Sequence, residues 1–253
     1  MAAGIIVAGQ PRFLPNILGY GDPGGGGNSL AVGLVAYWKF DESSGTSAAD
    51  ATGRGNTLTL SGTPTPTWVA GLIDNAIDFA GGSITEVAAR ANPSGQDLDF
   101  AGTSFNIACW FKINTLVAGR QFLGRDSGGA GGRQFSLQLA GTNTLNMRCF
   151  DGTNQVAVVN LTYTNGAWQF VEVGVDLTVG AFGQMFASVN GGARSTNNLT
   201  AAIGAVTTDF RIGRSGAAVS IDSNMDATGK WNRPLTEAEV AFLYNGGAGR
   251  YPI

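Results

Sequence analysis

Short segments in which apolar and polar residues alternate recur along the chain from about residue 34 onward. The clearest is FNIACWFKI at 105–113, where Phe105, Ile107, Cys109, Phe111 and Ile113 share one face of an expected strand. Comparable segments lie at 35–40, 56–60, 76–79, 134–139, 144–150, 156–161, 185–189 and 210–213. Turn sequences such as GTN at 141–143 and NGG at 190–192 separate them. The pattern predicts an antiparallel, all-β protein.

One helix is expected, close to the C-terminus. Thr236 and Glu239 have the spacing of a capping box, in which hydroxyl and carboxylate satisfy free N–H groups of the first turn. An apolar stripe follows at Val240, Leu243 and Tyr244, and the Asn-Gly pair at 245–246 is typical of a left-handed helix end.

Composition agrees with a many-stranded chain that turns often. Glycine makes up 39 of 253 residues and charged residues only 13%, against usual shares of about 7% and about 25%. The net charge is -3 without a basic run, so the signature of a nucleic-acid binder is missing. No apolar run reaches the ~20 residues of a membrane span. The first residues have no positively charged segment before their apolar stretch, so we interpret them as mature protein rather than a signal peptide.

The chain contains no histidine. This excludes histidine-based acid–base catalysis, Ser-His-Asp and Cys-His nucleophiles, and imidazole metal sites. The two cysteines, Cys109 and Cys149, lie in strand-like apolar segments, and we expect two buried thiols. The alternative is a single bridge between neighbouring strands.

Several motifs in order resemble one family. They are YWKFDESSGT with DATGRGN at 37–56, WVAG followed by AIDFAG at 68–81, the strand at 105–113, GAWQFVEV at 166–173, and DATGKWNRPLTEAEVAFLY at 226–244. Together they resemble the laminin G-like, concanavalin A-like lectin/glucanase superfamily. Gln169 and Phe170 depart from the pattern, since the family often has histidine there. The resemblance implies a two-sheet antiparallel jelly-roll sandwich with one short C-terminal helix, over residues 34–253.

The same resemblance implies a structural calcium near the first and last strands. Asp50 and Asp226 stand at the acidic positions of those segments and are the expected ligands. An alternative role for Asp226 is to cap a neighbouring segment or to pair with Arg233. No other cofactor is expected.

Catalysis is not expected. Glu172 and Asp176 have the period-2 spacing that places two carboxylates on one strand face, as in glycosidases. The related glucanase motif needs a further carboxylate between them, and Gly174 occupies that position. The five tryptophans fall at framework positions of the family motif, so any sugar recognition is expected from loop residues and tyrosines.

Residues 1–33 form a separate Gly/Pro-rich region with apolar residues at 5–7, 13–14 and 17–18 and four glycines at 24–27. We expect an arm that docks on the domain, on a neighbouring copy or on a larger assembly, rather than a disordered tail. Such a leader before one sandwich resembles capsid decoration proteins, head fibres or adhesins of bacteriophage virions. The favoured function is therefore a non-catalytic module on a virion surface, anchored by residues 1–33 in a homo-oligomer or virion assembly and able to bind host glycans. The alternative is an extracellular carbohydrate-binding module without a virion role, and a glycoside hydrolase is less favoured.

Overall fold

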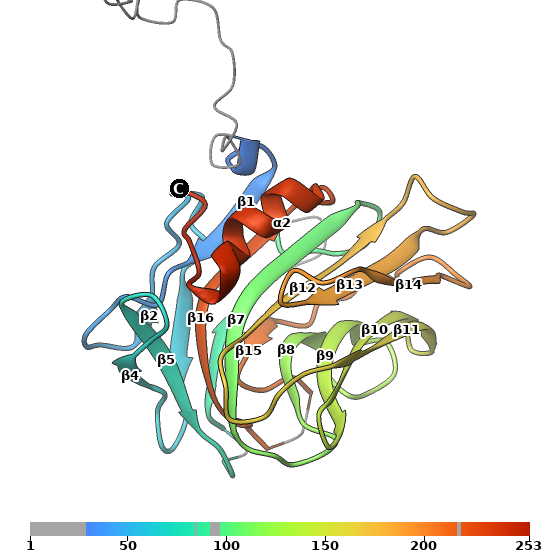
Figure 1. Ribbon diagram of the computed structural model, residues 1–253. Coiled ribbons are helices and arrows are strands. Elements are labelled where there is room, and N and C mark those ends of the chain that lie inside the picture. The colour runs from blue at the N-terminus through green and yellow to red at the C-terminus, as the bar shows by residue number, and fades with distance from the viewer. Residues whose placement is uncertain (1–28, 84, 92–96, 217–218) are drawn as a thin grey trace, which may run out of the picture.

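The computed structural model describes residues 29–83, 85–91, 97–216 and 219–253, which form two antiparallel β-sheets packed face to face (Figure 1). Sheet A has the order β14-β13-β12-β7-β16-β5-β4, and β1 also pairs with β16. Its strands are Ser195–Asn198, Gln184–Val189, Gln169–Asp176, Phe105–Thr115, Asp222–Trp231, Asn75–Ala80, Thr67–Ala70 and, for β1, Leu34–Trp38. The predicted all-β sandwich with one short C-terminal helix is confirmed.

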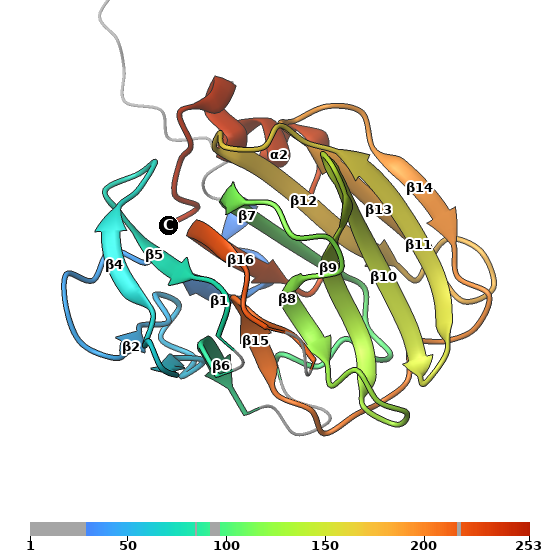
Figure 2. The same ribbon diagram turned by 90° about the horizontal axis from the view of Figure 1, so that it is seen from below.

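Sheet B has the order β11-β10-β9-β8-β15-β6-β3-β2. Its strands are Gln155–Thr162, Thr144–Gly152, Arg133–Gly141, Gln121–Asp126, Phe210–Ile212, Val87–Arg90, Leu58–Ser61 and Ser47–Ala48. Figure 2 looks onto this sheet, with β8 to β11 toward the viewer. The two sheets meet at the edge strands β11 and β14, where Asn197 Nδ2 donates to Val158 O at 3.0 Å.

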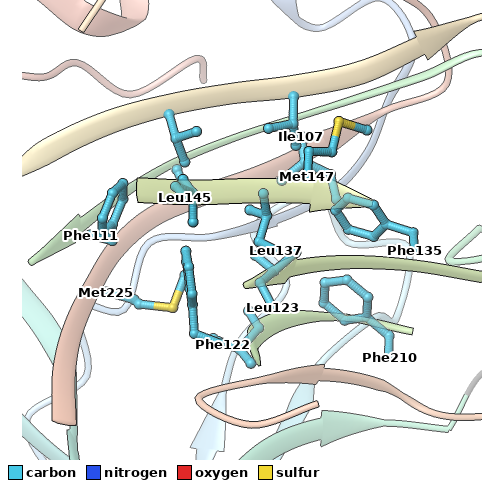
Figure 3. Packing of buried hydrophobic residues seen from close by; sticks show 14 of the residues in the cluster. Ile107, Phe111, Phe122, Leu123, Phe135, Leu137, Leu145, Met147, Phe210 and Met225 are labelled. Carbon is cyan, nitrogen blue, oxygen red and sulfur yellow. The ribbon is translucent and has the colours of Figure 1, made fainter. Parts of the chain in front are cut away.

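The main core lies between the sheets. The five alternating residues predicted to share a face of β7 all belong to it. Figure 3 shows two of them, Ile107 and Phe111, with side chains from β8, β9, β10, β15 and β16. Phe111 of sheet A packs against Phe122 of sheet B, with ring centroids 5.4 Å apart. Cys109 and Cys149 are both buried and free, which confirms the expectation of two buried thiols and not the alternative of a bridge.

A second apolar cluster covers the outer face of sheet A. Trp110 of β7 and Trp231 of β16 pack there against Val240 and Leu243 of helix α2, Glu237–Tyr244 (Figure 1). The capping box at the start of α2 is confirmed, since Glu239 N donates to Thr236 Oγ1 and Thr236 N to Glu239 Oε2. A single-turn 3-10 helix, Asn245–Gly247, follows α2. Among the described residues no helix is long and apolar enough to span a bilayer.

Residues 29–33 are held against this second cluster. Leu30 is fully buried in it, and the indole Nε1 of Trp231 donates to Leu30 O at 2.7 Å. The guanidinium of Arg233 donates to Val32 O and Ser29 O, each at 2.9 Å. The remaining residues of the expected arm, 1–28, lie outside the described residues, so the predicted docking of the whole arm stays a prediction.

Candidate functional site

Asp50, one of the two expected calcium ligands, organises the loop that follows β1. Its Oδ1 accepts hydrogen bonds from Tyr37 N at 3.1 Å, from Thr52 N at 3.0 Å and from Thr52 Oγ1 at 2.7 Å. Its Oδ2 accepts from Asn56 N at 2.9 Å. Because a carboxylate offers about four acceptor positions, these bonds occupy Asp50 as a loop anchor, and it fits poorly as a metal ligand.

Asp226, the other expected ligand, lies at a β-bulge in β16, where Ala227 has a φ of 44°. Its Oδ2 accepts hydrogen bonds from Leu72 N at 3.0 Å and Ile73 N at 2.9 Å. This agrees with the capping alternative, whereas Arg233 pairs with Glu239 instead of Asp226. Burial raises the pKa of the Asp226 carboxyl to about 7, and its Oδ1 is buried without a hydrogen-bond partner.

The two carboxylates therefore have different roles. The Oδ1 atom of Asp226 has no hydrogen-bond partner and could bind a cation, whereas both carboxylate oxygens of Asp50 already accept hydrogen bonds. Within the described ranges, no three His, Cys, Asp or Glu side chains are grouped so that they could hold a metal. The calcium site stays a prediction, with Asp226 the better-fitting residue of the pair.

Glu172, the first carboxylate considered for catalysis, is committed to structural contacts. It is fully buried and accepts from Asn106 Nδ2 at 2.7 Å, from Ser188 Oγ at 3.2 Å and from Arg194 Nε at 3.1 Å. Arg194 Nη2 also donates to its Oε1. A carboxylate whose four acceptor positions are all occupied has no free lone pair to use on a substrate.

Neither of the remaining positions of that motif completes a catalytic pair. Asp176 accepts from Thr178 N at 2.9 Å and Thr178 Oγ1 at 2.7 Å, which closes a local turn. A Cβ on Gly174 would collide with Phe105 O and the Phe186 ring, so packing excludes any side chain there. The described residues of β12 therefore give no support to hydrolysis.

The outer face of sheet B carries a different set of polar side chains, which strand register aligns in two rows. In antiparallel strands, directly opposed residues point to the same side. The first row, the amide row, runs through Asn160, Asn146, Gln138 and Gln121. The second row, the arginine row, runs through Arg148, Ser136, Gly124 and Arg211. The residues that alternate with them, such as Met147, Leu137 and Ile212, point into the core.

We call these eight residues the sheet B face. It lies on the side of the sandwich opposite helix α2, and Figure 2 views the sheet from this side. Arg214 lies beside the face, near enough to Arg211 that this like charge adds to the burial that lowers the pKa of Arg214.

Several buried polar atoms of this face have no protein partner. They are Arg148 Nε, Asn146 Oδ1 and Gln121 Oε1, with Arg214 Nε at its margin. A buried donor or acceptor left without a partner costs about 1–3 kcal/mol. Burial also lowers the pKa of Arg148, whose charged form is thus partly desolvated. Asn146 and Arg148 are half-buried side chains that a polar ligand could approach, whereas Gln121 is buried.

Sequence reasoning did not find this face. Its residues come from segments that are far apart in the chain, and none of them belongs to a recognisable motif. The only signal was the alternation in the expected strand at 144–150, where Asn146 and Arg148 alternate with the apolar Leu145, Met147 and Cys149. The tryptophan expectation agrees with the structure, because Trp38, Trp110 and Trp231 are buried and Trp68 and Trp168 pack partly buried against the clusters.

Comparisons with known proteins agree with the observed fold. A family profile described as the concanavalin A-like lectin/glucanases superfamily matches residues 86–241. No curated protein sequence matches the chain.

Solved structures with the same fold are similar at low sequence identity. Domain 4 of AbnA, an extracellular GH43 arabinanase from Geobacillus stearothermophilus solved in complex with arabinotriose, is 16% identical with a TM-score of 0.62, over 86% of this chain and 98% of that one. The binding domain of Paraclostridial Mosquitocidal Protein 1 is 13% identical with a TM-score of 0.66, over 85% of this chain and 52% of that one.

The binding domain of Botulinum Neurotoxin DC in complex with SialylT is also 13% identical, with a TM-score of 0.64 over 86% of this chain and 52% of that one. The chain thus spans about half the length of both toxin domains. These similarities show the architecture.

Proposed function

The chain belongs to the concanavalin A-like lectin/glucanase superfamily, and we propose that it is a non-catalytic module that binds a carbohydrate on the sheet B face. The observation that carries the proposal is the pair of unpartnered polar atoms, Arg148 Nε and Asn146 Oδ1, on two half-buried side chains of this face. Sugar hydroxyls both donate and accept hydrogen bonds, so a glycan can satisfy both kinds of group.

Two further points support a binding role. Domain 4 of the arabinanase shares the architecture over nearly its whole length, and its structure holds arabinotriose. The carboxylate considered for catalysis, Glu172, is neutralised by Arg194. We therefore place the protein among binding modules and not among glycoside hydrolases.

We propose that the module acts on a virion surface, with residues 1–33 as its attachment and host glycans as its ligands. The alternative setting is an extracellular module without a virion. Support for attachment comes from the Gly/Pro-rich composition of the leader and from the contacts that hold residues 29–33 on the domain. Deletion of residues 1–28 should abolish incorporation into particles or oligomers, and unchanged incorporation would remove the attachment role.

A glycan array followed by calorimetry tests the carbohydrate proposal. The intact protein should bind at least one oligosaccharide, with arabinotriose included among the probes, and Asn146→Ala combined with Gln138→Ala should weaken that binding. Gln184→Ala is the matched control. It deletes an amide on β13 of sheet A, away from the sheet B face, and should leave the affinity for the oligosaccharide unchanged. Equal affinity in all three proteins would place the glycan elsewhere, and release of reducing sugar from any bound probe would contradict the non-catalytic assignment.

A further inference from the structure

Resting on the proposed function, we propose that the glycan held on the sheet B face is acidic, and that Arg148 and Arg211 bind its anionic groups. The shared chemistry is a negatively charged substituent on a sugar, either a carboxylate or a sulfate. The inference names the class of ligand and the side chains that select it.

The geometry of the arginine row suits such a ligand. Arg148 pairs with Ser136, Ser136 with Gly124, and Gly124 with Arg211, which separates the two arginines by three strand spacings. At about 4.8 Å per spacing, their Cα atoms lie roughly 14 Å apart. Since the residues between them are serine and glycine, no large side chain stands between the two guanidinium groups.

The central glycine of this row cannot be replaced. Gly124 has a φ of +157°, and a Cβ there would collide with Phe135 O and lie 2.8 Å from Ser136 Cα. Close packing of β8 against β9 thus keeps position 124 of the row free of a side chain. Arg148 lies over the neighbouring Ser136, with Nη2 donating to Ser136 Oγ at 3.3 Å.

The distribution of charged residues also favours an acidic ligand on the sheet B face. The whole chain has a net charge of -3, yet the sheet B face contains Arg148 and Arg211, with Arg214 at its margin. Arg133 is paired with Asp126 at 3.1 Å and Arg211 with Asp209 at 3.3 Å. In the part of the chain that the structure describes, Arg148 and Arg214 have no carboxylate within ion-pair distance.

The arginines at 148 and 214 are also partly desolvated, which sets them apart from ordinary surface arginines. Each has a buried Nε without a hydrogen-bond partner, and burial lowers the pKa of each. A planar guanidinium presents two parallel N–H groups that match a carboxylate or sulfate in a bidentate pair. Asp126 is near enough to act on the charge of Arg148, but no carboxylate of the described residues contacts either side chain, and an anionic sugar would supply that contact.

The amide row completes the site. Asn146 Oδ1 is a buried acceptor without a partner, and Gln138 and Asn160 stand on either side of it in the row. Amide groups recognise hydroxyls without regard to charge. We therefore assign orientation of the sugar to the amide row and selection of its charge to the arginine row.

Calorimetry with the full chain tests the inference. The probes are trigalacturonate, its methyl ester, which has the same backbone without charge, a sulfated trisaccharide, and inorganic phosphate. At least one acidic trisaccharide should bind about tenfold or more tightly than the methyl ester, and rising salt should weaken that binding. Arg148→Gln and Arg211→Gln should each remove most of the preference, and Arg148→Lys should retain part of it. Arg250→Gln, which removes an arginine near helix α2, is the matched control and should leave the preference for the acidic probe unchanged.

Each other outcome is decisive. Equal binding of trigalacturonate and its methyl ester, with no preference for the sulfated probe, overturns the acidic assignment and leaves the carbohydrate proposal standing. Binding of phosphate as tight as that of the trisaccharides also overturns it, because the sugar then contributes nothing. Absence of binding by every acidic and neutral glycan defeats both proposals. Should an arginine variant fail to fold, the salt dependence and ester comparison on the unaltered protein still decide.

Discussion

Glu172 and Arg194 form a buried ion pair beside helix α2, with Arg194 Nε donating to Glu172 Oε2 at 3.1 Å and Arg194 Nη2 donating also to Leu235 O. The pair thus joins β12 to the segment that leads into the helix. The carboxylate side chain is 1% exposed and the guanidinium side chain 25%. These contacts have consequences for stability.

Replacement of Glu172 by Gln should destabilise the fold, because it leaves the positive charge of Arg194 half-buried without a counter-charge. We expect a loss of about 2–3 kcal/mol in the free energy of unfolding, measured by urea denaturation. Glu172→Gln combined with Arg194→Leu should lose less than the single change, since no unpaired charge remains. Glycan affinity should be unchanged in both variants. A selective loss of binding would show that the pair has a role in the ligand site.

Lys230 should make stability depend on pH in the alkaline range. Its side chain is buried and donates to Asp97 O and Asp99 O, and burial lowers its pKa from 10.5 to about 8. The folded state then binds fewer protons than the unfolded chain between about pH 8 and 10.5, so the Lys230 contribution to stability should rise across that window.

The measurement is the urea midpoint of the protein and of Lys230→Met at several pH values from 8 upward. Because tyrosines also titrate there, the difference between the two proteins is the informative quantity. The urea midpoint of the unaltered protein should increase relative to that of Lys230→Met as pH rises. A difference that stays constant with pH would mean that the ammonium group keeps an ordinary pKa.

Asp50→Asn should destabilise the loop after β1 independently of calcium. The amide keeps one acceptor oxygen but replaces the other by a donor that faces Asn56 N, so we expect a cost of about 2 kcal/mol. Thermal midpoints should be taken in calcium and in chelator. The loss should be the same in both, whereas a calcium-dependent loss would make Asp50 a ligand.

The same experiment tests Asp226. If calcium binds through its free Oδ1, the midpoint of the unaltered protein should rise in calcium, and Asp226→Asn should not show that rise. An unchanged midpoint in the unaltered protein would count against the calcium site altogether.

Residues 29–33 should contribute to the stability of the domain. Leu30 is fully buried in the second apolar cluster, so Leu30→Ala should cost about 2–3 kcal/mol. Deletion of residues 1–33, which removes Leu30 and its neighbours, should lower the midpoint further than deletion of residues 1–28. Equal midpoints in the two deletions would show that Leu30 and its neighbours add nothing.

Many of the strands, the inward face of β7 and helix α2 could be predicted from the sequence, since each depends on residues close together in the chain. Strands β2, β6, β8 and β14 were not predicted. Alternation at 105–113 identified the core face of β7, and the spacing of Thr236 and Glu239 identified the start of α2. Residues near in sequence determine both the core face of β7 and the start of α2, and the tertiary contacts of these elements agree with the predictions.

The candidate site could not be predicted in the same way. Arg148 and Arg211 lie in one row only because β10, β9, β8 and β15 are neighbours in a particular register, and no local sequence pattern specifies that register. Likewise, Glu172 resembled a catalytic carboxylate until the structure placed Arg194, 22 residues further along the chain, against it. Function in this fold depends on which distant strands lie side by side.

The contacts of Trp231 and Arg233 with residues 29–33 also determine a direction. They fix the point where the chain enters the domain on the side of helix α2, and the sheet B face lies on the opposite side of the sandwich. The point of entry and the arginine and amide rows are therefore on opposite sides of the domain, so the preceding residues join it away from the proposed binding face.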